Sequence, residues 1–512
     1  MIEENKSSMK NSVRRLIIAG IGVLIQIIWV VVLVMRLNQY SQIITLLTVA
    51  IELVLVLAVY SMDTNAAFKL PWIILITVAP IVGICVFFLF GRSGATKKVR
   101  ARYRKIDQQL FAYLNQDEQI IDELSKKDER LANDFKYLWK CASSPVYKNT
   151  DVKYYGDTCD AMAAQLEDMM QAKKFIFLEY HAIEMAESFQ ALRKVLMAKA
   201  REGVEIRILY DDAGCIGFLN PRFIKYMESM GIQCRVFNPI MPVLNIFMNN
   251  RDHRKITVID GKVAYTGGYN LADEYFNITH PYGQWKDSGI RFEGDAVQTA
   301  TILFLEMWNA LREQDVDIEK YLPVYPYKAK EQGFFALYGD SPLDKEPAGE
   351  NVYMNLLRHA KKYIYFTTPY LILSDEMTRE LTGAANRGVD VRIITPGIPD
   401  KKTIFQVTKS YYPQLLKHGV KIYEYTPGFM HEKQCICDGE IVVVGTINLD
   451  FRSLYLHFEN AALFCGYEAV SHVKEDFDAL FPICKDMSKE PSERTRRLRL
   501  SQLILRLFSP LM

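Results

Sequence analysis

The sequence contains few cysteines, and none of them is arranged in a metal-binding pattern. The chain has nine cysteines among 512 residues, without a C-x-x-C pair. Cys435 and Cys437 are two residues apart, which fits alternate positions of a strand better than a metal knuckle. We therefore expect reduced, buried thiols in a cytosolic compartment. No ligand cluster in the sequence points to zinc or to another metal.

The sequence also lacks a dominant sign of charge. Lys+Arg 62 against Asp+Glu 60 leaves a net charge of +2, which excludes a uniformly basic, nucleic-acid-binding chain. Hydrophobic residues make up 50% and charged residues 24%, so wholesale disorder is excluded as well. The length is sufficient for two or three domains.

Long hydrophobic runs are present near the N-terminus, at residues 16–35, 43–60 and 70–90. The first carries no charge, and its length of about 20 residues matches a bilayer core. It is too long for the h-region of a signal peptide, and another hydrophobic run follows at once. We predict that residues 1–95 form a transmembrane anchor, with Glu52 facing another helix or the membrane interface.

The charges beside these runs give conflicting indications of topology. Basic residues after the third run place the remainder of the chain inside, but basic residues before the first run place the N-terminus inside too. Three spans cannot satisfy both. The basic residues after the third run are Lys97, Lys98, Arg100, Arg102, Arg104 and Lys105. Those before the first run are Lys6, Lys10, Arg14 and Arg15. We expect a multi-pass protein of the cell membrane with a cytoplasmic globular part, and the number of spans stays open.

The remaining sequence contains an internal duplication. Ala-Lys-Lys followed by four apolar or aromatic residues occurs at 172–178 and again at 360–366. Each copy continues through a helical stretch into a strand that follows a glycine, at 201–208 and at 386–393. This order is that of a βαβ unit, which implies parallel strands and a right-handed crossover. The sequence therefore predicts an α/β fold of two pseudo-symmetric halves, each a mixed or parallel sheet flanked by helices.

These patterns divide the chain into five segments. The anchor (1–95) precedes a basic juxtamembrane helical linker (96–150), a first half (151–335), a second half (336–482) and a basic amphipathic tail (483–512). Arginines and leucines alternate in the tail at helical spacing, which suits an anionic membrane surface. Packing of this helix on the catalytic body is the alternative interpretation.

Each half carries the same motif of chemically active residues. His and Lys two apart on a strand point to the same face, and Asp-Gly between apolar runs predicts a two-residue hairpin. Because turn geometry alone explains an Asp at such a position, a structural role is the preferred interpretation of the two aspartates. The motif residues are His253, Lys255, Asp260 and Asn270 in the first half, and His431, Lys433, Asp438 and Asn448 in the second.

Two such hairpins facing each other suit a phosphodiester substrate. One histidine can attack phosphorus while the other protonates the leaving oxygen, because imidazole titrates near neutral pH. The two lysines and the two asparagines offset charge on the non-bridging oxygens. The sequence thus predicts a covalent phosphohistidine intermediate and two in-line steps.

The doubled motif resembles the signature of the phospholipase D superfamily. Further segments are similar to bacterial cardiolipin synthases, and the likeness covers roughly residues 40–512. These segments are Trp285 to Asp287, Thr368 to Tyr370, Asn448 to Ser453, Leu507 to Leu511 and Trp72 to Gly91. The resemblance implies that two phosphatidylglycerols give cardiolipin and glycerol by phosphatidyl transfer through histidine, with no metal or nucleotide cofactor.

The resemblance also implies roles for individual residues. In such families a carboxylate from each half orients a catalytic histidine, and Asp287 and Glu459 fall at matching places after the motifs. A surface salt bridge is the alternative for these two acids. Family analogy favours His253 as nucleophile and His431 as acid. Gly268 and Thr446 stand where the superfamily often has serine, so a hydroxyl donor is in doubt in the first half.

Three functions fit these observations. They are a cardiolipin synthase, a membrane-bound phospholipase D that hydrolyses phospholipid to phosphatidic acid, and a catalytically silent scaffold, which the complete set of His and Lys disfavours. The hairpins would also suit a nuclease, but the anchor holds the site beside lipid headgroups. We therefore expect phosphatidylglycerol and anionic lipids as partners, and no nucleic acid. The identity of the second substrate and the oligomeric state stay open.

Overall fold

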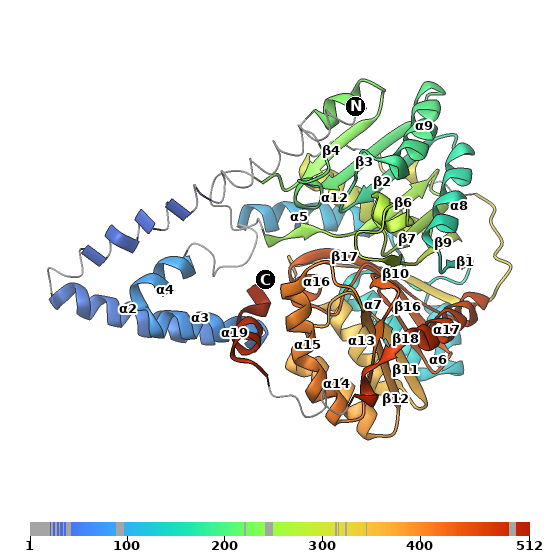
Figure 1. Ribbon diagram of the computed structural model, residues 1–512. Coiled ribbons are helices and arrows are strands. Elements are labelled where there is room, and N and C mark those ends of the chain that lie inside the picture. Colours follow the sequence, from blue (N-terminus) through green and yellow to red (C-terminus); the bar gives the residue numbers. More distant parts are fainter. Residues whose placement is uncertain are drawn as a thin grey trace.

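The computed structural model describes most of the chain, from α2 to the C-terminal helix (Figure 1). The described residues are 42–88, 97–219, 222–240, 249–312, 315, 317–322, 325–344, 346–490 and 498–511, with positions scattered between 21 and 36. The first hydrophobic run and three of the tail arginines (Arg494, Arg496 and Arg497) lie largely or wholly outside them.

The first half is built on a mixed sheet of seven strands (Figure 1). In order across the sheet these are β1 (Thr150–Tyr155), β9 (Gly289–Gly294), β7 (Val263–Gly267), β6 (Lys255–Ile259), β2 (Phe175–Tyr180), β3 (Glu205–Asp211) and β4 (Gln233–Phe237). The β2–β3 and β3–β4 pairs are parallel. Helix α9 (Glu187–Arg201) connects β2 with β3, as the βαβ pattern predicts, and α8 (Thr158–Met170) lies beside it.

The second half repeats this arrangement. Its strands, in order, are β10 (Phe334–Asp340), β17 (His457–Cys465), β16 (Ile441–Gly445), β15 (Gln434–Cys437), β11 (Tyr363–Thr367), β12 (Asp390–Pro396), β13 (Lys421–Tyr425) and β18 (Cys484–Asp486). Its helices are α13 (Ala348–His359), α14 (Asp375–Asn386), α15 (Lys402–Lys417) and the short α16 (Phe451–Tyr455). Apart from β18, each strand has a counterpart at the same position in the first sheet. This equivalence confirms the predicted mixed α/β fold of two like halves.

A shared hydrophobic core joins the two sheets. Helix α12 (Val297–Leu311) packs on the first sheet and also contacts β10, whereas α17 (Glu468–Leu480) packs on the second sheet and also contacts β1. Aromatic rings cross the interface, with Phe292 and Phe335 at 5.0 Å between centroids. Because both sheets bury apolar faces in this one core, separating the halves would expose a large apolar area. The relative position of the two motifs is therefore fixed by packing.

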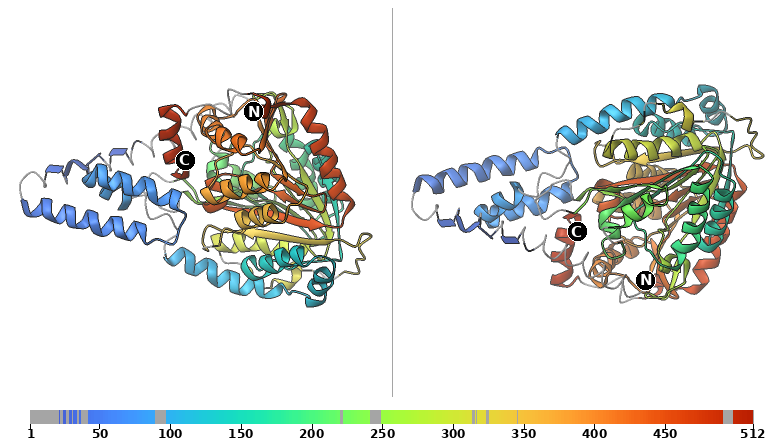
Figure 2. Two further views of the ribbon diagram at one scale, coloured as in Figure 1. Left: turned by 90° about the horizontal axis from the view of Figure 1, so that it is seen from below. Right: turned by 90° about the horizontal axis from the view of Figure 1, so that it is seen from above.

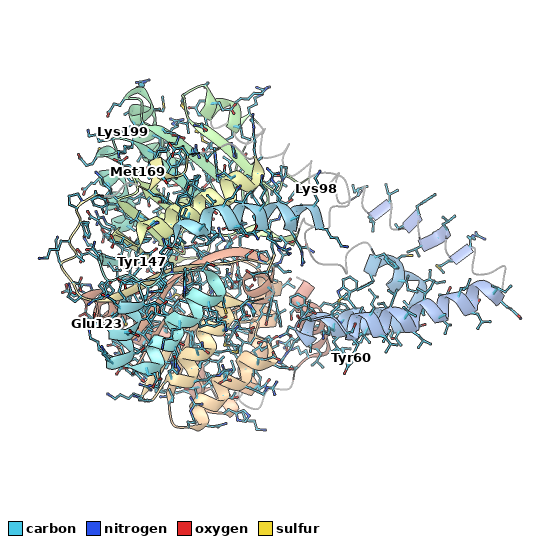
Figure 3. The ribbon with its side chains drawn as sticks, turned by 180° about the vertical axis from the view of Figure 1, so that it is seen from behind. Tyr60, Lys98, Glu123, Tyr147, Met169 and Lys199 are labelled. Carbon is cyan, nitrogen blue, oxygen red and sulfur yellow. The ribbon has the colours of Figure 1, made fainter. Side chains whose placement is uncertain are left out.

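Three helices from the early part of the chain project from one side of this body (Figure 2). They are α2 (Gln42–Tyr60), α3 (Ala66–Val78) and α4 (Pro80–Val86). Within the described residues, none of the helices is both long and apolar enough to cross a bilayer, so the prediction of N-terminal transmembrane helices is not supported there. Figure 3 shows Tyr60, at the end of α2, and Lys98 on the side of the body from which these helices project.

The third hydrophobic run differs from its prediction for a clear physical reason. Its chain breaks at Ala79, whose φ of −138° and ψ of 72° are not helical, because the following Pro80 disfavours a helical conformation of the residue before it. The two short helices then fold back on each other, and the rings of Trp72 and Phe87 meet at 5.5 Å. A Cβ at Gly83 would lie 2.5 Å from Ile76 Cα, so only glycine permits this approach.

The segments on either side of the two halves are also helical. Helices α5 (Lys97–Leu110), α6 (Glu118–Lys127) and α7 (Glu129–Ala142) occupy the predicted linker, and α5 packs on α12. Helix α19 (Leu500–Phe508) lies in the predicted tail and contacts α15 and α3. The boundaries of the five segments stay a prediction.

Candidate active site

Two short strand pairs that cross between the halves position the two histidines. His253 follows β5 (Arg251–Asp252), which pairs in parallel with the start of β17. His431 follows β14 (Gly428–Met430), which pairs in parallel with β8 (Gln284–Lys286) of the first half. The His253 N–H donates to Phe458 O at 2.8 Å, and the His431 N–H donates to Lys286 O at 2.8 Å. Each histidine is thus bonded through its backbone to the opposite half.

The same crossing brings each imidazole to a carboxylate of the other half. His253 Nδ1 lies 2.8 Å from Glu459 Oε2, and His431 Nδ1 lies 2.5 Å from Asp287 Oδ2. Both carboxylates are buried, at 0% and 2% exposed, so a surface salt bridge does not describe them. A carboxylate at Nδ1 holds the proton on that nitrogen and directs Nε2 away from it. Nε2 is then the nitrogen available for chemistry in His253. In the second half, Lys433 Nζ also lies 2.7 Å from His431 Nδ1, and the same assignment holds there when Asp287 is the group that accepts the Nδ1 proton.

Both motif lysines are buried beside these histidines. Lys255 Nζ donates to His253 O at 2.6 Å, and Lys433 Nζ donates to His431 O. Burial lowers the pKa of Lys255 to about 7 and that of Lys433 to about 8. Burial, and then the charges of both lysines, holds the pKa values of His253 and His431 well below the usual histidine value. Each histidine therefore senses the lysine of the opposite half, and the four side chains form one site.

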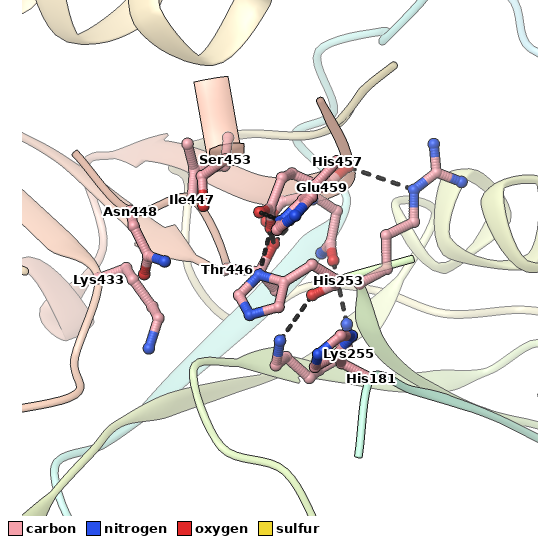
Figure 4. Close-up of polar contacts among 12 residues, drawn as sticks. His181, His253, Lys255, Lys433, Thr446, Ile447, Asn448, Ser453, His457 and Glu459 are labelled. Carbon is pink, nitrogen blue, oxygen red and sulfur yellow. Dashed lines mark hydrogen bonds and ion pairs between the residues drawn. The ribbon is translucent and has the colours of Figure 1, made fainter. Parts of the chain in front are cut away.

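At the position equivalent to Thr446, the first half has a glycine for a structural reason. Thr446 Oγ1 donates to Glu459 Oε2 in the second half, as Figure 4 shows. The equivalent position in the first half is Gly268, where an added Cβ would lie 2.1 Å from Asp287 Oδ1. The carboxylate of Asp287 occupies the space that a larger residue would need.

The two motif asparagines have partners within the protein. The Asn270 side chain accepts from Ala182 N at 3.1 Å and donates to Tyr275 Oη at 2.8 Å. Asn448 Nδ2 donates to Asp450 Oδ2 at 3.1 Å. An amide nitrogen has two hydrogens, so each asparagine can still donate one to a phosphate, and their predicted role stays a prediction.

The two motif aspartates bind backbone rather than the reaction centre. Asp260 accepts from the N–H groups of Lys173, Lys174 and Phe175 at 2.8, 2.7 and 2.9 Å. Asp438 accepts from the equivalent N–H groups of Lys361, Lys362 and Tyr363, each at 2.8 Å. Both have a φ of +54° in their hairpin turns. These contacts hold the two repeated segments against equivalent hairpin turns and favour the structural interpretation.

We expect Asp260→Ala to destabilise the protein by about 2–4 kcal/mol, because three buried or half-buried N–H groups lose a charged acceptor. Asp260→Asn should cost less, since asparagine tolerates a positive φ and keeps one acceptor oxygen. Thermal and denaturant unfolding measure the difference. The folded fraction should keep its turnover per molecule, and a specific loss of turnover at unchanged stability would contradict the structural role.

Several residues at the site were not predicted from the sequence. The His181 and His457 rings lie 5.0 and 5.5 Å from the His253 ring. The Tyr275 and Trp285 rings lie 5.1 and 5.0 Å from the His431 ring. A strand period of two places His457 on the face of Glu459, a signal that the sequence does contain.

Comparisons with known proteins agree with this geometry. A family profile described as the phospholipase D-like domain of cardiolipin synthase matches residues 166–308 and 353–481. A Streptococcus mutans protein is 39% identical over 90% of this chain and 99% of its own length. A cardiolipin synthase of Halalkalibacterium halodurans is 32% identical over 86% of this chain and 87% of its own. A cardiolipin synthase 2 of Bacillus anthracis is 30% identical over 86% of each chain.

A solved structure shares the fold. The phosphatidylserine synthase of Haemophilus influenzae superposes with a TM-score of 0.55, at 13% identity, over 70% of this chain and 93% of its own. The family profile places the duplicated sheets and the paired His-Lys motifs in the phospholipase D superfamily. Within it, the chain belongs to the bacterial cardiolipin synthase family.

Proposed function

We propose that this protein is a cardiolipin synthase that transfers a phosphatidyl group between two phosphatidylglycerols, releasing glycerol. The observation that carries the proposal is the pair of buried His-carboxylate contacts, each of which joins one half to the other. Two oriented imidazoles and two lysines at one centre suit a double displacement at phosphorus. The family membership supports phospholipid substrates.

In the first step, His253 Nε2 attacks the phosphorus of one phosphatidylglycerol. The bond from phosphorus to the glycerol oxygen breaks, and His431 donates a proton to that oxygen, so that glycerol leaves. The anionic phosphate raises the pKa of the surrounding imidazoles on entry, which offsets the effect of the lysines and favours imidazolium at His431. The lysines stabilise the charge of the non-bridging oxygens.

In the second step, the neutral His431 removes a proton from a headgroup hydroxyl of another phosphatidylglycerol. That oxygen attacks the phosphorus, the bond to His253 breaks, and cardiolipin forms with both histidines restored to their starting states. Two inversions at phosphorus give overall retention of configuration.

Incubating the purified protein with phosphatidylglycerol and separating the lipids tests this function. Equal amounts of cardiolipin and glycerol support the synthase, whereas phosphatidic acid with glycerol supports a hydrolase. An unchanged lipid would leave only the scaffold interpretation. Adding phosphatidylethanolamine shows whether another lipid can act as acceptor.

The buried lysines predict a pH dependence of substrate binding. Their lowered pKa values of about 7 and 8 mean that the ammonium charge is lost as pH rises through this range. We expect KM for phosphatidylglycerol to rise from about pH 7 upward, by up to roughly tenfold per pH unit for one essential ammonium. Lys433→Arg keeps its charge and should flatten the rise. A KM that stays constant from pH 7 to 9 would show that the ammonium charges do not hold the phosphate.

We also propose that the projecting helices α2, α3 and α4, together with α19, which contacts α3, insert into lipid. Leu46 and Leu57 of α2 are 71% and 66% exposed, and Leu500 of α19 is 73% exposed. Exposed apolar side chains at this density mark an interaction surface, and the substrate is a lipid. We expect the protein to resist extraction from membranes by alkaline carbonate, and replacement of Leu46, Leu53 and Leu57 by aspartate to release it. Extraction of the unaltered protein by carbonate would contradict insertion.

A further inference from the structure

A second group of side chains lies behind His253. His457 Nδ1 lies 3.5 Å from Glu459 Oε1, and His253 Nδ1 lies 2.8 Å from the other oxygen of the same carboxylate. One ligand atom from each of the three residues lies within 4.8 Å of the other two. Glu459 therefore stands between two imidazoles, and Figure 4 draws the three side chains together.

The outer part of this group has unused bonding capacity. Among the described residues, the two ring nitrogens of His457 have no hydrogen-bond partner, and the Oε1 atom of Glu459 has none either. Yet Glu459 is fully buried, and the His457 side chain is only 11% exposed. A distance of 3.5 Å is too long for a good hydrogen bond. It is close to the distance between two neighbouring ligand atoms of a tetrahedral zinc ion, which is about 3.3–3.4 Å when the bonds to zinc are 2.0–2.1 Å.

An acidic cavity reaches His457, the outer member of this group. It has a volume of about 430 Å³, and His457 forms part of its lining. Its carboxylates include Asp63 and Glu376, which are exposed. Arg100 is the one lysine or arginine among the described lining residues. The further acids are Asp340, Asp344, Glu346 and Glu350. Burial raises the pKa values of Asp340 and Glu350, and it raises that of Asp344 to about 7. Only part of this lining therefore attracts cations near neutral pH.

We propose that His253, His457 and Glu459 form an inhibitory site for a divalent transition-metal ion of the zinc type. Two imidazoles and one carboxylate are a donor set that zinc accepts. The metal takes the Nδ1 lone pair of His253, and the proton that Nδ1 shared with Glu459 is released to solvent. His253 then loses its orienting carboxylate, and the cation withdraws electrons from its ring. Turnover stops, so this consequence rests on the proposed function.

The test is a comparison of His457→Asn with the unaltered protein. We expect micromolar Zn²⁺ to inhibit cardiolipin synthesis and EDTA to reverse it. In His457→Asn, inhibition is measured relative to that variant's own synthesis without zinc, and the inhibitory concentration should rise by roughly tenfold to a hundredfold. His472→Asn is the matched control, because His472 is 46% exposed on α17 and should not alter inhibition. Equal inhibition of both variants would refute the site.

A direct measurement separates the site from the function. Co²⁺ added without lipid should give the intense visible absorption of a four-coordinate ion in the unaltered protein, and the band should be lost in His457→Asn. If this occurs in a protein that makes no cardiolipin, the site stands and the proposed function fails. If neither Co²⁺ binding nor Zn²⁺ inhibition depends on His457, the proposal is overturned.

Discussion

Replacement of His253 or His431 by alanine should reduce cardiolipin formation by about 10³–10⁴-fold or more, because each step of the double displacement needs both imidazoles. One forms the bond to phosphorus, and the other moves the proton that the leaving or entering oxygen gains or loses. The double variant should be little worse than either single one, since residues that act as a unit are not additive. Radiolabelled phosphatidylglycerol gives the sensitivity that the assay requires.

The two variants should differ in what they accumulate. If His253 is the nucleophile, a mild substitution such as His431→Gln leaves the attacking nitrogen but removes the acid, so phosphatidyl groups collect slowly on His253. Rapid quenching and mass spectrometry of the peptide would locate the modified residue. His472→Ala is a control for expression and assay, and circular dichroism checks the fold of each variant. Full activity of either histidine variant would refute the paired mechanism.

The motif residues were predictable because their chemistry depends on local sequence. An Asp-Gly turn after an apolar run predicts a strand, and His and Lys two positions apart on a strand lie on the same face. Neither inference needs tertiary information. The duplication added the prediction of two like sheets. The strand orders confirm it, and no long-range knowledge was needed beyond the handedness of βαβ units.

Contacts between the halves were less predictable. The pairing of Asp287 with His431, and of Glu459 with His253, depends on the short strands β8, β14 and β5, whose lengths of two or three residues leave little sequence signal. His457 is 204 positions from His253, so the group that could hold a metal was invisible to a search for local ligand spacing. Likewise, hydropathy predicts one continuous run at residues 70–90, because it does not include the backbone restriction that Pro80 imposes.

The crossed carboxylates carry the second large expected effect. Asp287→Asn and Glu459→Gln should each reduce turnover by roughly 10²–10⁴-fold, because a neutral amide no longer stabilises the imidazolium or holds its proton on Nδ1. Both acids are buried, and the amide replacements preserve volume. A loss of stability is therefore a separate quantity that unfolding measurements can report.

The pH profiles of these two variants should differ, and the difference assigns the histidine roles. Without its carboxylate, an imidazolium has a lower pKa. If His431 is the acid, Asp287→Asn reduces the protonated fraction at neutral pH, and the basic limb of the kcat profile moves to lower pH. Glu459→Gln leaves that limb in place, because a nucleophile acts in its neutral form and loses reactivity instead. The opposite pattern would exchange the two roles, and two unshifted profiles of normal amplitude would show that neither carboxylate orients a catalytic histidine.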